Sequence, residues 1–243
     1  MDKIIDLDLD FFQNDVVRDF CSIQNGKNGL KHWCEEDVRD YLENHIGLST
    51  RVRGRIFKTH DKAFYFWREL VKQNRLKIPF EVDHLDAHSD MGFGNNVWLQ
   101  MINSYMHLPI KKRSSIPLKQ MNEGNYIIFA FAMGWISKFH YIHHEKYEAD
   151  LLACWFKDFD ISTNKIQMVA CDNLVTEDFF DLRNKIHKIV RKDETIDFQL
   201  SKPSDYKNIN KISYLSVSVS PNYICPDTQR NILPIIEEYI DKI

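Results

Sequence analysis

Two short segments combine apolar residues with acidic residues at alternating positions, and they limit the folds open to this chain more than any other feature. They are IIDLDLDFF at Ile4–Phe12 and VDHLDAHSD at Val82–Asp90. In a strand, alternate side chains point to opposite faces, so the first segment has one acidic face and one apolar face. Carboxylates on a buried strand are costly unless a cation neutralises them. We therefore expect buried strands whose acidic ends hold metal.

The rest of the chain alternates predicted strands and helices, which indicates one three-layer α/β/α domain over residues 1–243 with a mainly parallel sheet. The predicted strands are Lys3–Phe12, Pro79–Leu85, Lys165–Cys171 and Lys211–Val219. The predicted helices are Glu35–His45, Asp61–Asn74, Glu177–Lys192 behind an N-cap at Thr176, and a last one from Pro226 to Lys242 that Pro234 should kink or split.

Two further segments have less regular patterns. Tyr126–Ile136 is apolar on all sides and is expected to be buried, as either a helix or a strand. Leu108–Asn122 is polar, and we expect a long loop whose Lys-Lys-Arg run is solvated.

Composition excludes several classes of protein. The net charge of −3 argues against a nucleic-acid-binding protein with a large basic face, and no apolar run is long enough to span a membrane. Five cysteines without a CxxC pair indicate reduced thiols in a cytoplasmic protein. The oligomeric state is left open.

Ligand-type residues gather at the ends of the two acidic segments. Asp86, His88 and Asp90 share one parity, as do Asp8 and Asp10. Parallel strands end at one rim of a sheet, so these side chains are expected to converge there. A mixture of carboxylate and imidazole suits Mn²⁺, and Fe²⁺, Co²⁺ or Zn²⁺ are alternatives. An exposed acidic turn and a solvated edge strand are the competing interpretations.

Other polar residues have two interpretations each. His60 precedes a predicted helix and could complete a ligand shell or be an exposed loop histidine. His84 could support the metal ligands or be a core histidine with satisfied hydrogen bonds. The remaining candidates are Ser216, Ser218 and Ser220, which could contact substrate or pack under a helix, and His140, His143 and His144, which could include a proton shuttle but are more commonly a surface cluster.

These motifs together resemble the arginase–agmatinase superfamily. LDAHSD is similar to its DAHxD motif, DLDLDFF to its D-x-D strand end, and THD to the segment carrying the first metal's histidine. The resemblance implies an arginase-like fold with two Mn²⁺ ions and a bridging hydroxide that attacks a guanidinium carbon. It assigns His60 and Asp90 to the first ion, His88 and Asp10 to the second, and Asp8 and Asp86 to both.

The order of the motifs resembles a divergent branch of that superfamily. D-x-D precedes DAHxD here, whereas it follows in ordinary arginases, and the segments that bind the α-groups of a free amino acid are not evident. This order, with His84, EGNYI at Glu123–Ile127 and SVSPNY at Ser218–Tyr223, is similar to peptide arginases. The resemblance implies a hydrolase that converts arginine in a peptide substrate to ornithine and releases urea.

A planar, cationic guanidinium needs carboxylates or carbonyls around it. Glu123 is the first candidate, followed by Asp172 and Asp83, although a surface or capping role is commoner for each. Asn95 and Asn96 could form hydrogen bonds with the backbone of a peptide substrate. The expected catalytic residues are Asp8, Asp86, Glu123 and His84. The alternatives are hydrolysis of a small guanidino compound or another C–N bond at the same site, and a non-catalytic binding protein.

Overall fold

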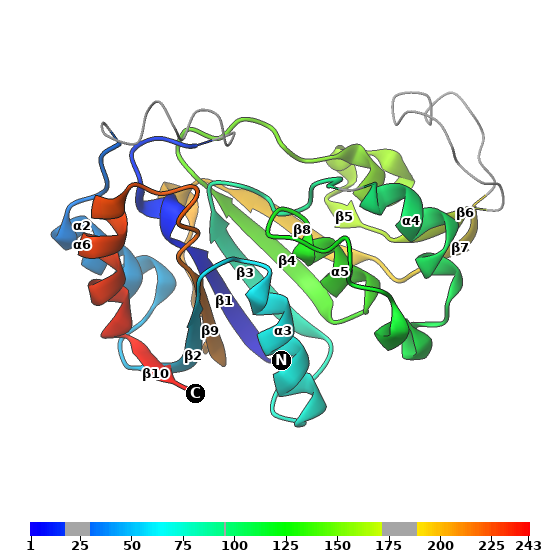
Figure 1. Ribbon diagram of the computed structural model, residues 1–243, viewed down its shortest axis with the longest axis horizontal. Coiled ribbons are helices and arrows are strands. Elements are labelled where there is room, and N and C mark those ends of the chain that lie inside the picture. The colour runs from blue at the N-terminus through cyan, green and yellow to red at the C-terminus, as the bar shows by residue number, and fades with distance from the viewer. Residues whose placement is uncertain (18–29, 95, 172–188) are drawn as a thin grey trace.

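The computed structural model describes residues 1–17, 30–94, 96–171 and 189–243, and a large twisted sheet lies at its centre (Figure 1). Eight strands form this sheet among the described residues, in the order β10-β2-β9-β1-β3-β4-β8-β5. Each neighbouring pair is parallel except β5 with β8. The strands are β1 Lys3–Asp8, β2 Val52–Phe57, β3 Phe80–Asp86, β4 Ile136–His143, β5 Lys165–Ile166, β8 Ile196–Ser201, β9 Tyr214–Ser218 and β10 Ile240–Lys242, and a separate antiparallel pair consists of β6 Val169–Cys171 and β7 Ile189–Lys192.

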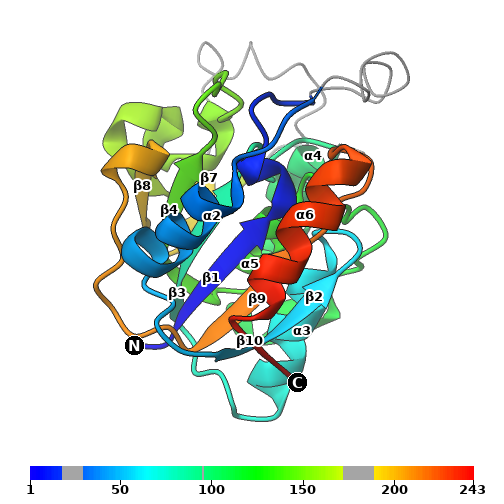
Figure 2. The ribbon, with the colours of Figure 1, turned by 90° about the vertical axis from the view of Figure 1, so that its left-hand side faces the viewer.

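Helices cover both faces of the sheet, which confirms the expected three-layer α/β/α architecture. Figure 1 shows α3, α4 and α5 in front of it, and Figure 2 shows α2 and α6 over the opposite face. The helices are α2 Glu35–Asp40, which continues as a π-helical turn at Tyr41–Ile46, α3 Lys62–Lys72, α4 Val97–Asn103, α5 Tyr126–Ala132 and α6 Pro226–Glu237. Short 3-10 turns lie at Leu9–Phe12, Tyr105–His107, Ile110–Ser115, Ala153–Trp155, Lys157–Phe159, Ile161–Thr163 and Pro203–Asp205.

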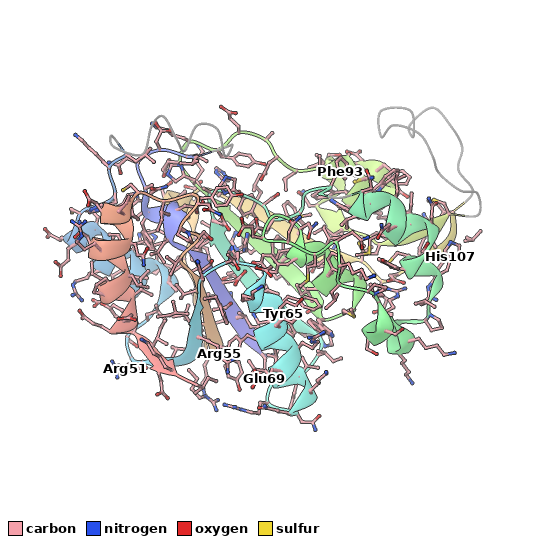
Figure 3. All side chains as sticks on the ribbon, in the orientation of Figure 1. Arg51, Arg55, Tyr65, Glu69, Phe93 and His107 are labelled. Atoms are coloured by element: carbon pink, nitrogen blue, oxygen red, sulfur yellow. The ribbon has the colours of Figure 1, made fainter. Side chains whose placement is uncertain are left out.

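Strand parity divides the buried side chains between two cores. Ile4 on β1 joins Phe64 and Trp67 of α3 in the core on the α3 and α5 side. Ile5, its neighbour in the chain, points the other way and joins Ile232 of α6. The outer side of α3 is polar, and Glu69 there pairs at 3.0 Å with Arg55 of β2 (Figure 3). Each strand of this central region is therefore buried on both faces.

The first strand is shorter than expected. The sequence predicted Lys3–Phe12, but β1 ends at Asp8 and a 3-10 turn follows at Leu9–Phe12. The Asp8 carboxylate accepts the backbone N–H of Asp10 at 3.2 Å, which caps this turn. A side chain that can bond its own backbone competes with the strand ladder, and here it ends the strand.

Several other predicted bounds also change. Tyr126–Ile136 contains the fully buried helix α5, and β4 begins only at Ile136. The strand prediction at Lys165–Cys171 covers two short strands, β5 and β6, and that at Lys211–Val219 narrows to β9. The last helix runs through Pro234 without being split and ends at Glu237, because β10 forms beyond it.

Most of the predicted helix Glu177–Lys192, with its cap Thr176, lies outside the described residues. Its last four residues are described, and there the prediction was wrong. Ile189–Lys192 forms strand β7, which pairs with β6. Alternating burial along β7 fits an edge strand that is covered on one face.

The expectation of a solvated Lys-Lys-Arg run was wrong for Arg113. Its guanidinium is fully buried, donates to the carbonyl oxygens of Leu108 at 2.8 Å and Ala132 at 2.9 Å, and pairs with Asp193. This side chain ties the loop to the end of α5.

The described cysteines Cys34, Cys154, Cys171 and Cys225 are free thiols, as expected. Among the described residues no helix is both long and apolar enough to cross a bilayer.

Candidate metal centre

The register of the sheet brings the two acidic segments together. β1 and β3 are direct neighbours in which Asp6 lies opposite His84. Asp8 and Asp86 are the last residues of these strands and meet at the same rim. We call the following residues the acidic cluster: Asp6, Asp8, Asp10, Asp86, Asp90, His60, His84 and His88.

Four donor atoms of this cluster surround one point beside His60. The His60 Nδ1 atom lies 3.3 Å from Asp8 Oδ2, 2.8 Å from Asp86 Oδ2 and 3.1 Å from Asp90 Oδ2. Neither ring nitrogen makes a hydrogen bond of acceptable geometry with any described residue, and neither does Asp90 Oδ2. Ligands about 2.1 Å from one ion stand about 3.0–3.4 Å apart. The distances therefore fit the edges of a coordination shell.

A second group of donors shares Asp86. The Nδ1 atom of His88 lies 3.1 Å from Asp10 Oδ2 and 3.5 Å from Asp86 Oδ1. The other ring nitrogen of His88 lies 2.9 Å from the carbonyl oxygen of Val17, to which it can donate. Burial lowers the pKa of His88, but Asp10 and Asp86 outweigh this and raise it to about 12, so the ring is protonated when no cation is present. In the neutral ring that donates to Val17, Nδ1 carries no proton and can bind a cation. Asp86 therefore directs one oxygen to each histidine.

Hydrogen bonds from backbone N–H groups and from one serine hydroxyl hold three carboxylates of the cluster in place. Asp86 Oδ1 accepts from the N–H of His88 at 2.8 Å, and Asp10 Oδ1 accepts from the N–H of Ala87 at 3.2 Å. Asp8 accepts the hydroxyl of Ser220 on its Oδ2 atom. Each carboxylate is thus held in one orientation, with an oxygen turned toward the histidines.

Asp6 lies behind the candidate ligands and holds the histidines in position. Its oxygens accept hydrogen bonds from Ser216 at 2.6 Å and from the hydroxyl of Tyr126, and they face the Nδ1 atom of His84 at 3.0 Å. The Asp6 carboxylate also lies 3.3 Å from His60 Nε2. A carboxylate behind a ligand histidine fixes the orientation of its ring.

His84 has both ring nitrogens occupied, because Nε2 lies 3.2 Å from the carbonyl oxygen of His88 and Nδ1 faces Asp6. It belongs to the supporting layer of the cluster. Burial lowers the pKa of His84, but Asp6 and Asp86 outweigh this and raise it above the usual value.

The cluster carries more negative charge than its own residues can balance. Five carboxylates are almost fully buried beside three histidines. With all five carboxylates ionised and all three histidines protonated, two negative charges would remain. Burial, with Asp86 beside it, raises the pKa of Asp90 to about 7, and burial with Asp86 and Asp8 raises the pKa of Asp10 well above its usual value. These groups fit a divalent cation, which would supply the missing charge.

Local backbone geometry brings His88 and Asp90 into the site. β3 ends at Asp86, so the alternation that was expected to align these residues stops there. Asp90 has φ 51°, in the left-handed region that non-glycine residues seldom adopt, and Ser220 has φ 45°. Such strained positions gather at functional sites.

The acidic cluster opens into a cleft of about 210 Å³. Glu123 lies on its wall because Gly92 donates to the carbonyl of Gly124 at 2.8 Å, an approach that a Cβ atom at Gly92 would obstruct. Burial, with Asp61 and Asp8, raises the pKa of Glu123. The cleft is lined by Asp8, Asp10, His60, Asp86, His88, Ser89, Asp90, Gly92, Glu123, Gly124, Asp150, Ser220 and Tyr223.

The six expected metal ligands and Glu123 therefore share this cleft, and His84 lies just behind it. The sequence did not single out Asp150, which lies in no repeating pattern, and it included Ser89 only as part of the LDAHSD motif. Tyr223, whose ring packs edge-on against His88 at 5.1 Å between centroids, was noted only as part of a motif.

Other expected residues lie elsewhere. Asp83 is buried on the opposite face of the sheet, where Lys3 and Tyr206 bind it, so it is no guanidinium partner in this cleft. Asn96 is exposed and does not line the cleft, and Asp172 and Asn95 lie outside the described residues. Among the serines, Ser220 lines the cleft and Ser216 supports Asp6.

The three clustered histidines are buried, so the interpretation as a surface cluster was wrong. His140 lies 2.8 Å from the hydroxyl of Ser201, and His144 Nε2 lies 2.7 Å from the carbonyl oxygen of Gln13. His143 Nδ1 lies 2.8 Å from the carbonyl oxygen of His144. None of the three lines the described cleft.

No protein-family model matches the chain, and no curated protein is significantly similar to it in sequence.

Proposed function

We propose that the protein is a Mn²⁺-dependent hydrolase that converts arginine side chains of a peptide substrate to ornithine and releases urea. The observation that carries this proposal is the position of Asp86, whose two oxygens face His60 and His88 respectively. A carboxylate that belongs to two groups of donors, each containing a histidine nitrogen and carboxylate oxygens, is suited to a pair of divalent ions.

Each ion would have its own ligands and share two. His60 and Asp90 would hold the first ion, His88 and Asp10 the second, and Asp8 and Asp86 both. Carboxylates mixed with imidazole suit Mn²⁺. When bound, such ions lower the pKa of water, so that a hydroxide nucleophile is available at neutral pH.

The residues of the chain would orient the substrate and hold the metal ligands in place. Glu123 lies on the cleft wall, where its carboxylate can pair with a guanidinium. His84 and Asp6 would keep the His60 ring and the Asp86 carboxylate in place through the contacts described above. Tyr223 would shield the His88 side of the cleft with its ring.

A peptide suits the cleft better than free arginine. Among the described residues that line it there is no lysine or arginine to pair with the α-carboxylate of a free amino acid. In a peptide that group is an uncharged amide, so nothing is left unpaired. We expect a higher kcat/KM for an arginine blocked at both ends than for free arginine, and the reverse order would contradict a peptide substrate.

Mass spectrometry of arginine-containing peptides after incubation with the protein and Mn²⁺ tests the reaction. Conversion to ornithine lowers the peptide mass by about 42 Da and releases one urea. An unchanged mass over a panel of peptides, with urea released from a small guanidino compound, would favour that smaller substrate. A protein that binds metal and alters neither substrate would be a binding protein.

A further inference from the structure

Asp150 lines the cleft without belonging to either group of metal donors. It lies in the irregular segment after β4, next to Leu151 and Leu152, and no sequence motif marks it. Its Oδ2 atom accepts the backbone N–H of Ser89 at 2.6 Å. Ser89 stands between His88 and Asp90, so this hydrogen bond fixes the Asp150 carboxylate relative to the donor loop.

The other oxygen of Asp150 has no hydrogen bond of acceptable geometry, although the Tyr147 side chain interacts with the carboxylate. Its Oδ1 atom is buried and makes no hydrogen bond with any described residue. A buried acceptor without a donor costs about 1–3 kcal/mol. Because the atom belongs to a cleft-lining side chain, a ligand with N–H donors could satisfy it.

The charge of Asp150 is also only weakly compensated. Burial raises its pKa, and the hydrogen bonds from Ser89 and the charge of His88 only partly oppose this rise. No lysine or arginine among the described residues lines the cleft, so a bound cation would be the natural counterion.

Glu123 and Asp150 sit near different metal-donor groups. The charges that act on Glu123 are those of Asp61, Asp8 and His60, whereas the charge that acts on Asp150 is that of His88. A guanidinium has five N–H donors and no acceptor, so it can engage two carboxylates at once. A compact ammonium offers fewer directed donors, and a neutral urea group has no charge to offer.

We propose that Asp150 is a specificity-determining residue that binds the cationic head of the substrate and selects guanidinium over neutral side chains. This inference rests on the proposed function for the identity of the head group. The fixed Oδ2 atom aims the carboxylate, and the free Oδ1 atom accepts the substrate N–H.

The test compares two probes that differ in charge. N-acetylarginine amide carries a guanidinium, and N-acetylcitrulline amide carries a neutral urea of nearly the same shape. Stopped-flow titration of the Mn²⁺-loaded protein, which records binding before the first turnover, should show a preference for the arginine probe of about tenfold to a hundredfold, the range expected for a hydrogen bond to a charged group. Asp150→Asn should reduce this preference to less than about threefold, because the amide keeps the acceptor for Ser89 and loses the charge.

Two controls separate recognition from structural damage. Glu145→Gln removes an exposed carboxylate from the same segment and should keep the wild-type preference. The metal content of Asp150→Asn should equal that of the wild type. Asp150→Glu, which restores the charge, should recover part of the preference.

The outcomes distinguish this inference from the proposed reaction. The wild type could release no urea and still prefer the arginine probe, with this preference absent in Asp150→Asn. In that case the role of Asp150 stands and the proposed reaction fails. If the wild type converts arginine and Asp150→Asn keeps the full preference, the reaction stands and the role of Asp150 is wrong. A wild type that binds both probes equally, or binds neither, also overturns that role.

Discussion

Buried carboxylates on the two faces of strands β1 and β3 differ in whether the chain supplies a basic side chain to pair with them. On the face toward α2 and α6, Asp83 pairs with the Lys3 ammonium at 2.6 Å and accepts the Tyr206 hydroxyl at 2.6 Å. On the face toward α3 and α5, the acidic cluster holds five buried carboxylates and no lysine or arginine among the described residues.

This difference separates a charge that the chain neutralises itself from a cluster that could hold a metal ion. Asp83 brings its own counterion, so that face can fold without help from solution. The acidic cluster instead leaves His60 and Asp90 Oδ2 without hydrogen bonds and keeps an excess of negative charge. A bound cation could neutralise these groups.

The largest effect should follow from removing a shared ligand. Asp86→Ala or Asp8→Ala should lower urea release more than about a thousandfold, because each carboxylate is assigned to both ions. His84→Ala should leave measurable activity, about tenfold to a hundredfold below wild type, since it only supports the ligands. Steady-state urea assays measure this, with Asp241→Asn on exposed β10 as a control. Wild-type turnover by Asp86→Ala would refute the assignment.

Substitutions on the opposite face, at Lys3 and Asp83, should change the free energy of unfolding and leave metal binding unchanged. Lys3→Met leaves Asp83 buried without its counterion and should lower the free energy of unfolding by about 3–5 kcal/mol. The double variant Lys3→Met with Asp83→Leu should recover most of this loss. Denaturant titration gives both values, and the Mn²⁺ content of folded Lys3→Met should equal that of wild type. An unchanged unfolding free energy in Lys3→Met would mean that the pair does not stabilise the fold.

A smaller effect should come from His140, which lies beside Asp83 on the same face. Burial lowers the pKa of His140 to about 4, against about 6.5 when unfolded. As the pH falls, the His140 ring takes up a proton in the unfolded chain before it does so in the folded chain. The free energy of unfolding therefore decreases by about 2–3 kcal/mol between about pH 6.5 and pH 4. His140→Gln should flatten this part of the profile of unfolding free energy against pH. An equally steep fall in the variant would assign the effect to other groups.

Alternation and motif spacing in the sequence were enough to predict the parallel sheet, the three layers and the meeting of the two acidic segments, whereas the full set of six ligands, with His60, came from the resemblance. They worked because β1 and β3 are adjacent and parallel, so Asp8 and Asp86 meet at one rim. The parity argument failed at Asp10 and Asp90, since both lie beyond their strands. A capped 3-10 turn and a left-handed residue place them in the site instead.

Features that depend on distant partners could not be predicted locally. Arg113 appeared to belong to a solvated basic run because its partner, Asp193, lies 80 residues further along the chain. Ile189–Lys192 has a helical apolar pattern but pairs with β6. Asp150 has no local pattern, and only the folded cleft identifies it as a candidate.

Metal stoichiometry tests the central claim most directly, namely that the acidic cluster exists to bind two divalent ions. The purified protein would be stripped with chelator, loaded with Mn²⁺, desalted and weighed by native mass spectrometry. We expect two Mn²⁺ ions per chain in the wild type, a loss of at least one in Asp86→Ala, and an unchanged two in the Lys3→Met and Asp83→Leu double variant. A wild-type chain that binds no more than one ion after loading, or that releases urea fully while metal-free, would contradict the account.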